Sequence, residues 1–288
     1  MTLFQMQPER ANPDIPFPLP ACAHLVQYGC VKPEGGHRTS QWTSQFRSIP
    51  DKQTLQEEMR EEWDNGARVD WRRSVWAEAS GSEKAFRASG ERDYKRSVGR
   101  LLSAFQIDPA GKVALEIGCG AGRVSEFIAR DFRGLIAVEI SRELLKIGRR
   151  RVAADNVLWL CNDGVSLGPV ADHSVDFIFS LAVFQHIPDA ATIIDYFEEA
   201  SRVLKPGGWV VFQVMNQPHL SIGPWTVSLF VSRRFHVPRV RVYKPSVRDA
   251  RPARMGFVRT SCTRAGLAVV RVIDRFNQNT WVWAQKSD

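Results

Sequence analysis

The chain has 288 residues, of which 44% are hydrophobic and 24% charged, a composition typical of a globular protein with a sizeable core. No stretch approaches the roughly 20 apolar residues that a membrane span requires, and the N-terminal residues lack the basic start and apolar core of a secretory signal. The net charge of +8 suits either anionic partners or an ordinary arginine-rich surface. Five scattered cysteines argue against a disulfide framework and favour a cytoplasmic location.

Residues 1–50 are predicted to be an irregular N-terminal segment. Seven prolines interrupt any helix there, and no periodic apolar pattern is present. Cys22, His24, Cys30 and His37 could suggest a metal site. Their spacing matches no zinc pattern, so the sequence predicts a tail or cap and no metal.

Residues 51–106 are predicted to form a helical cap. Leu55, Met59 and Trp63 recur every four residues and give one apolar face. Ser89 and Gly90 interrupt the pattern, which resumes over residues 93–105. The segment has no β-branched runs, which favours helices over strands.

From residue 107 onwards, short apolar runs alternate with longer amphipathic runs. This alternation predicts βαβ units and a doubly wound, Rossmann-like α/β fold with a mostly parallel sheet and helices on both faces. Residues 217–256 break the alternation and are predicted to be a substrate or lid insertion. Two closing strands after the insertion bring the sheet to seven strands. The expected strands are residues 113–117, 135–140, 157–161, 175–181, 209–214, 267–272 and 280–284, and the expected helices are residues 123–132, 142–154, 190–204 and 258–265.

A buried strand runs directly into a glycine-rich loop at residues 113–123. Gly118, Gly120 and Gly122 allow a sharp turn and a close approach of the backbone to a ligand. The G-x-G-x-G spacing differs from the dinucleotide fingerprint G-x-G-x-x-G, whose third glycine is replaced by Arg123. Glu116 would repel a pyrophosphate but attract the ammonium group of S-adenosylmethionine. The charge therefore favours that cofactor over NAD.

Residues 115–122 closely resemble the first motif of the class I S-adenosylmethionine-dependent methyltransferase family. Glu139 ends the second strand about twenty residues beyond the loop, where an acid can accept both ribose hydroxyls. The resemblance implies that Asp163, in Asn-Asp-Gly after the third strand, accepts the adenine amino group. It also implies a turn at residues 204–208 before the fifth strand. The resemblance covers residues 107–216 well.

The cofactor set that follows from the loop and from this resemblance contains twelve residues. Glu139 alone could be a solvated strand-end acid, and Asp163 alone could be a turn residue. Their order on successive strand ends favours the cofactor site. Cys119 is expected to be a small packing residue rather than a nucleophile. The predicted set is Glu116, Gly118, Cys119, Gly120, Gly122, Glu139, Ile140, Asn162, Asp163, Gly164, Ser180 and Leu181.

The catalytic candidate is His186, just after the fourth strand, whose tip faces the transferred methyl group in this family. A histidine has a pKa suited to a general base near neutrality. The alternative is that His186 packs the loop. Phe184 and Gln185 are candidates for lining the acceptor pocket, while His219, His236 and Tyr243 are reserve candidates.

A basic stretch at residues 233–275 contains twelve Arg and Lys residues against two Asp residues. Because arginine suits phosphate and carboxylate groups, one hypothesis is an anionic acceptor, and the alternative is a solvated basic face. The predicted function is methyl transfer from S-adenosylmethionine to a small molecule, without a membrane partner. The rivals are an RNA or protein methyltransferase, a non-catalytic scaffold with this fold, and an NAD-binding domain. No nucleic-acid-binding module is recognisable, and the oligomeric state is not predicted.

Overall fold

The computed structural model describes residues 52–75, 82–216, 219–222, 225–231, 238–243, 250–273 and 279–288, and within residues 217–249 only the backbone. All of these belong to the unit that spans residues 50–288. The predictions for residues 1–50, including the metal alternative, lie outside the described residues. Among the described helices, none is long and apolar enough to cross a membrane.

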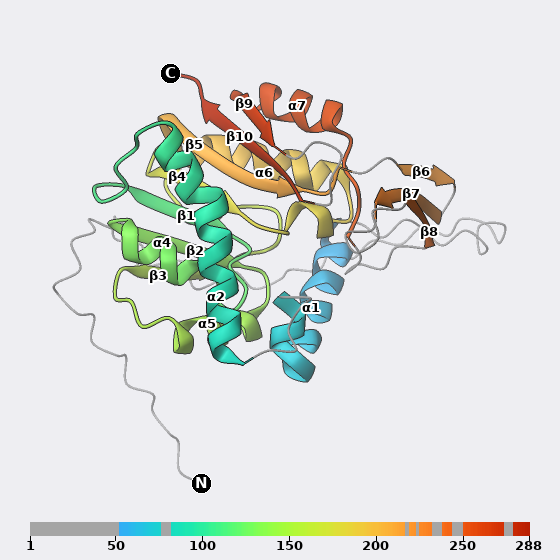
Figure 1. The fold of residues 1–288 in the computed structure, drawn as a ribbon, viewed down its shortest axis with the longest axis horizontal. Helices are drawn as coiled ribbons and strands as arrows, with labels where there is room; N and C mark the ends of the chain where they lie inside the picture. The colour runs from blue at the N-terminus through green and yellow to red at the C-terminus, as the bar shows by residue number, and fades with distance from the viewer. Residues whose placement is uncertain are drawn as a thin grey trace, which may run out of the picture. The chain divides into compact units, whose positions relative to one another are not determined.

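Helices occupy the predicted cap and alternate with strands after it (Figure 1). The cap is confirmed as helical, and one of its short turns is a π-helix. The break expected at Ser89 and Gly90 is wrong, because one helix spans Glu83–Tyr94 and Gly90 instead allows close packing on the backbone of Arg123. The boundaries of the later helices agree with the prediction to within a few residues. The helical elements are α1 (Lys52–Val75), α2 (Glu83–Tyr94), η1 (Lys95–Gly99), α3 (Arg100–Ala104), α4 (Ser125–Asp131), α5 (Arg142–Arg151), η2 (Phe184–His186), α6 (Ala190–Val203) and α7 (Met255–Arg264).

Seven strands form one sheet in the order β3-β2-β1-β4-β5-β10-β9. β1 to β5 are parallel to one another, and β10 runs antiparallel to both neighbours. The predicted doubly wound, mostly parallel seven-stranded sheet is confirmed. Its strands are β1 (Val113–Ile117), β2 (Gly134–Glu139), β3 (Val157–Cys161), β4 (Val175–Ser180), β5 (Leu204–Val214), β9 (Leu267–Ile273) and β10 (Thr280–Lys286).

The structure differs from the prediction at the start of the fifth strand. β5 begins at Leu204, which pairs with Val175, whereas the next pair along the ladder is Phe177 with Trp209. The residues expected to form a turn before β5 therefore lie inside the strand as an irregularity, with Gly207 at a φ of 69°. Pairing of the flanking residues with β4 continues across this irregularity, which the local sequence pattern did not indicate.

The sequence also did not predict a second sheet. β6 (His219–Ile222), β7 (Trp225–Val231) and β8 (Pro238–Tyr243) form an antiparallel sheet within the expected insertion. Strands of four to seven residues flanked by proline and glycine carry little periodic signal. The three described strands lie within the predicted insertion, whose role as a substrate or lid segment stays a prediction.

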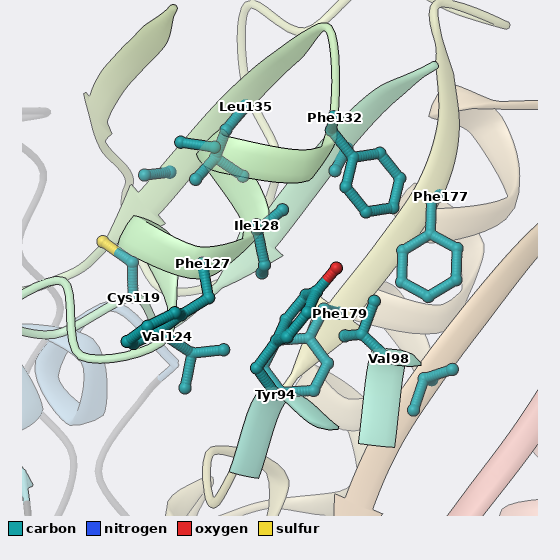
Figure 2. Close-up of a cluster of buried hydrophobic side chains, with 14 of the residues drawn as sticks. Tyr94, Val98, Cys119, Val124, Phe127, Ile128, Phe132, Leu135, Phe177 and Phe179 are labelled. Atoms are coloured by element: carbon teal, nitrogen blue, oxygen red, sulfur yellow. The ribbon is translucent and has the colours of Figure 1, made fainter. Parts of the chain in front are cut away.

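One face of the large sheet is covered by α3, α4 and the end of α2. Figure 2 shows Tyr94 and Val98 converging with Phe127 of α4 on Phe177 and Phe179 of β4. Alternate residues of a strand point to the same face, so the two phenylalanines of β4 contribute to one cluster. This packing brings α2 and α4 together behind the glycine loop.

The opposite face is covered by α6. Phe197 of α6 lies 5.1 Å, centroid to centroid, from both Phe184 and Phe212. Phe184 also packs edge-on against Tyr196. Because Phe184 is buried in this cluster, it anchors the segment after β4 rather than lining a pocket.

We predict that Gly90→Ala separates α2 from the glycine loop. A Cβ at Gly90 would lie 1.9 Å from the backbone oxygen of Arg123, and a backbone atom cannot yield as a flexible side chain can. Overpacking of this kind costs about 1–3 kcal/mol. Urea denaturation should show a loss of that size in the free energy of unfolding.

Gly99→Ala is the matched control, because its Cβ would have no neighbour closer than 3.7 Å. This substitution should leave stability unchanged or raise it by up to about 1 kcal/mol, since alanine favours helices over glycine. Equal stabilities of the two variants would contradict the close packing of α2 on the loop.

Candidate functional site

The glycine loop after β1 adopts backbone angles that glycine tolerates and other residues avoid. Gly118 and Gly120 have φ values of 71° and 55°. A Cβ at Gly118 would lie 2.2 Å from a methyl group of Val183, and one at Gly120 would lie 2.8 Å from a methyl group of Val75. The loop therefore needs glycine both for its turn and for the segments packed on it, as predicted.

A cavity of about 380 Å³ lies at the carboxyl ends of β1, β2, β3 and β4. Ligands of doubly wound sheets bind at this edge. Most of the predicted cofactor residues line the cavity, together with His186. The predicted residues found in the lining are Glu116, Gly118, Cys119, Gly120, Glu139, Ile140, Asn162, Gly164, Leu181 and His186.

Three predicted residues do not line the cavity. Gly122 lies against Val152 and Trp159, so its small size serves the packing of the loop. Ser180 is buried and donates a hydrogen bond to the backbone oxygen of Ile117, 3.2 Å away. The third residue is Asp163.

Asp163 is exposed and closes a turn after β3. Its Oδ1 accepts hydrogen bonds from the backbone N–H groups of Val165 and Ser166, at 2.9 and 2.8 Å. Its neighbours Asn162 and Gly164 line the cavity instead. The carboxylate thus shapes the strand end in the structure, and its contact with adenine stays a prediction.

Glu116 is the buried acid at the end of β1. Its Oε2 accepts a hydrogen bond of 2.5 Å from the hydroxyl of Ser125 in α4. Burial raises the pKa of Glu116 from its ordinary value of 4.5 to about 8, against the lowering effects of Ser125 and Arg123. A cationic ligand in the cavity would favour the ionised form.

Glu139, at the end of β2, ties the glycine loop to the start of α5. Its Oε2 accepts a hydrogen bond from the backbone N–H of Gly120 at 2.8 Å, and its Oε1 accepts one from the backbone N–H of Ser141 at 2.9 Å. Burial raises its pKa, and these backbone hydrogen bonds oppose the rise. Each oxygen of an ionised carboxylate can accept further hydrogen bonds, so Glu139 can still accept from a ligand in the cavity.

Cys119 is fully buried within the loop. Burial raises the pKa of its thiol well above the ordinary value, and the nearby acids Glu139 and Glu116 add to the rise. A buried thiol of this kind is not a nucleophile. These features support the expected packing role.

The segment after β4 turns back over the glycine loop. Ala182 has a φ of 59°, a left-handed conformation that non-glycine residues rarely adopt and that occurs often at functional sites. The turn brings Val183 against Gly118 and places Gln185 and His186 in the cavity wall. Nε2 of His186 lies 3.3 Å from Nε2 of Gln185.

Helix α1, part of the predicted helical cap, supplies one wall of the cavity. Met59 and Trp63 from its first part, and Arg73 and Val75 from its last turns, line the cavity. Trp63 packs edge-on against the ring of His186, with 5.4 Å between the ring centroids. The apolar face of α1 was visible in the sequence, and the folded chain shows which of its residues reach the cavity.

Asp64 fastens α1 to the cofactor edge of the sheet. This buried carboxylate accepts hydrogen bonds from the hydroxyl of Ser141 at 2.6 Å and from the backbone N–H of Glu143 at 3.1 Å. Both donors belong to the start of α5, where a negative charge is favourable. The backbone N–H of Ser141 also donates to Glu139, so α1 is linked through one residue to the buried acid of β2.

The described residues support neither a metal site nor the binding of an anionic acceptor by the basic stretch. Among the described residues, no group of three or more His, Cys, Asp or Glu side chains could hold a metal ion. The side chains of His219, His236 and Tyr243 lie outside the described residues, as do those of Arg233 to Arg248 in the basic stretch.

The comparisons with known proteins agree with this geometry. Residues 115–212 match the family model described as a methyltransferase domain. A ubiquinone biosynthesis O-methyltransferase from Neisseria meningitidis serogroup A is 28% identical over 171 residues, which make up 56% of this chain and 66% of that protein. A malonyl-(acyl-carrier protein) O-methyltransferase from Marinomonas sp. is 31% identical over 121 residues, which make up 41% of this chain and 43% of that protein.

The solved structures show the same fold. A magnesium protoporphyrin IX methyltransferase from Synechocystis PCC 6803, with bound S-adenosylmethionine, superposes with a TM-score of 0.54 at 15% sequence identity. The alignment covers 81% of this chain and 97% of that protein. The matched region of the sequence contains the glycine loop and the buried acids of β1 and β2, on the sheet order found here. Residues 115–212 therefore form a methyltransferase domain, on the fold of the class I S-adenosylmethionine-dependent methyltransferases.

Proposed function

We propose that the protein transfers a methyl group from S-adenosylmethionine to an oxygen atom of a small-molecule acceptor. The observation that carries this proposal is the pair of buried acids, Glu116 and Glu139, behind a glycine loop at the edge of the sheet where ligands bind. The two relatives described above are named O-methyltransferases, which supports oxygen as the acceptor atom.

The residues present fit this cofactor. Glu139 would accept the ribose hydroxyls, and the backbone of Gly118 and Gly120 would approach the methionine portion. Ile140 and Gly164 would enclose the adenine, since the side chain of Ile140 lies 2.7 Å from where a Cβ of Gly164 would be. Glu116 would attract the ammonium group. The two carboxylates in the lining balance its two arginines, Arg73 and Arg123, so the cavity has no excess of positive charge to favour a pyrophosphate.

When bound, the cofactor supplies an activated methyl group on a sulfonium, and its leaving group is a neutral thioether that needs no acid. The protein must therefore orient the acceptor and provide for the loss of its proton. Leu181 and Gln185 at the tip of β4 would orient it, and Met59 and Trp63 would exclude water. His186 is the candidate base of this site.

An anionic acceptor stays a prediction, because most of the basic stretch lies outside the described residues. Arg251 and Arg254 are the described residues of that stretch that precede α7. The backbone N–H of Arg251 donates to the backbone oxygen of Gln185 at 2.6 Å, which brings this end of the stretch to the acceptor side of the cavity.

Isothermal calorimetry with S-adenosylmethionine tests the proposal directly. We expect binding to the wild-type chain, and an affinity about fivefold lower for Asp163→Ala, because the turn at the end of β3 loses the three hydrogen bonds that Asp163 accepts. Asp163→Asn keeps an acceptor oxygen for the turn and should retain most of the affinity. No heat and no thermal shift with millimolar cofactor would exclude the proposed activity.

A further inference from the structure

The segment that follows β4 is held rigidly beside the expected position of the transferred methyl group. Ala182 is in the left-handed region with a φ of 59°, and Val183 occupies the space above Gly118. The backbone N–H of His186 donates to the oxygen of Val183 at 2.8 Å, and the N–H of Arg251 donates to the oxygen of Gln185 at 2.6 Å. The backbone of Gln185 is therefore anchored on both sides.

The amide nitrogen of Gln185 makes a polar contact, whereas its amide oxygen has none among the described residues. Its amide nitrogen lies 3.3 Å from Nε2 of His186. With the amide in this orientation its nitrogen donates, which requires Nε2 of His186 to accept and the ring proton to lie on Nδ1. Oε1 of Gln185 is buried, and within the described part of the chain no group donates to it. A buried acceptor without a donor is costly, and in a ligand site the ligand can supply that donor.

His186 holds the amide in this orientation. Its ring is packed edge-on by Trp63 from α1, and its Nε2 lone pair is directed to the amide nitrogen of Gln185. In the tautomer with its proton on Nδ1, rotation of the amide by half a turn would bring Oε1 against that lone pair, which is repulsive. This arrangement gives His186 a positioning role toward Gln185 in place of the role of base considered above.

Much of the cavity lining is apolar, although Arg73 and Ser74 of α1 also contribute to it. Met59, Trp63, Leu181, Val183 and Ile187 line the same cavity. Such walls bind an apolar body, and a few placed polar groups fix its orientation. An indole and branched aliphatic side chains suit a flat ring better than a hydrated polar chain.

We propose that Gln185 recognises the acceptor, with Oε1 accepting a hydrogen bond from the hydroxyl group of a flat, apolar, aromatic molecule. The proposal rests on the methyltransferase function proposed above, and it names the substrate class of that site. It also separates recognition of the hydroxyl by Gln185 from orientation of the amide by His186.

Phenol and anisole are suitable probes, because they share a ring but only phenol can donate a hydrogen bond. Ligand-observed NMR titrations would use the full chain saturated with S-adenosylhomocysteine. We expect the wild type to bind phenol about fivefold more tightly than anisole, the usual net effect of one hydrogen bond. Gln185→Met, which keeps the size but not the oxygen, should reduce this ratio to about one.

Two further variants test the acceptor oxygen of Gln185 and the role of His186 separately, and a third variant is the control. Gln185→Glu keeps an acceptor oxygen and should keep the preference for phenol, whereas His186→Phe keeps the ring contact with Trp63 and should reduce the preference. Gln285→Met is the control, because the amide of Gln285 bonds the backbone oxygen of Gly207 at 3.0 Å and does not line the cavity. It should behave as the wild type.

Calorimetry with S-adenosylhomocysteine on the same samples separates the two proposals. Absence of cofactor binding in the wild type would contradict the methyltransferase function. Normal cofactor binding without binding of phenol, without a preference for phenol, or with a preference that survives in Gln185→Met, would overturn the role of Gln185.

Discussion

Replacing Glu139 by Gln is expected to weaken the binding of S-adenosylmethionine by about 100-fold. Both oxygens of Glu139 accept backbone N–H groups, one from Gly120 and one from Ser141. An amide presents an NH₂ group at one end, so one of these donors would face another donor. The loop would lose a hydrogen bond in the free and the bound state alike, and the ribose would lose a charged acceptor worth about 1.5–3 kcal/mol, or roughly 10- to 150-fold in affinity.

Calorimetric titration measures this effect, and Glu143→Gln provides a matched control. Glu143 lies on the first turn of α5, four residues beyond Glu139, and pairs with Lys146 and Arg68 on the surface. Such exposed pairs contribute little, and Glu143 does not line the cavity. Its replacement should change the affinity less than twofold. A similar loss in both variants would contradict a specific role for Glu139.

Replacing Glu116 by Gln is expected to abolish a strong pH dependence of cofactor binding. Burial raises the pKa of Glu116 to about 8, so the acid is protonated near neutral pH in the free protein. A bound ammonium group favours the ionised form, and binding then releases a proton. The wild-type affinity should increase between pH 6 and 8, by up to about tenfold per pH unit.

Calorimetry in buffers of different ionisation enthalpy measures the released proton directly. The amide introduced by Glu116→Gln cannot ionise, so this variant should release fewer protons and show a flatter pH profile. Its affinity should also be lower at pH 8, where the bound wild type carries the full negative charge. An unchanged slope in the variant would show that another group titrates on binding.

Glu116→Gln should weaken cofactor binding at pH 8, but it should stabilise the folded chain at the same pH. The unfolded chain ionises Glu116 near 4.5, whereas the folded chain holds the proton up to about pH 8. Between these values the folded state binds more protons, so the contribution of Glu116 to the free energy of unfolding decreases as the pH rises. Burial also raises the pKa of Glu139, which acts in the same direction. The difference in denaturation free energy between wild type and Glu116→Gln should therefore grow from pH 5 to pH 8, in favour of the variant.

The sheet of the methyltransferase domain was predictable because its signals are local. β1 reads Val-Ala-Leu-Glu-Ile and is buried along its whole length, as a central parallel strand must be when helices cover both faces. The glycines after it are required by backbone angles and by close neighbours. Asp189 and Ser141 begin α6 and α5 as N-cap residues, in agreement with the predicted starts of these helices.

Elements with weak local patterns were predicted less well. The strands β6 to β8 are short and interrupted by proline and glycine, and their pairing is a contact between segments rather than a property of each segment. The irregularity at the start of β5 depends on how Leu204 and Trp209 pair with β4. Neither the pairing of β6 to β8 nor the irregularity of β5 can be predicted from one strand alone, because each depends on the partner strand.

Local sequence was enough to predict the class of fold, the glycine loop and the strand-end acids, because each depends on residues within a few positions of one another. The folded chain was needed to show that Trp63 and Met59 of α1 close the cavity. It was also needed to show that Asp64 reaches Ser141 and that Asp163 is engaged in its own turn. These contacts join residues far apart in the chain or depend on side-chain orientation. They follow from the packing of whole helices on the sheet, which no local periodicity encodes.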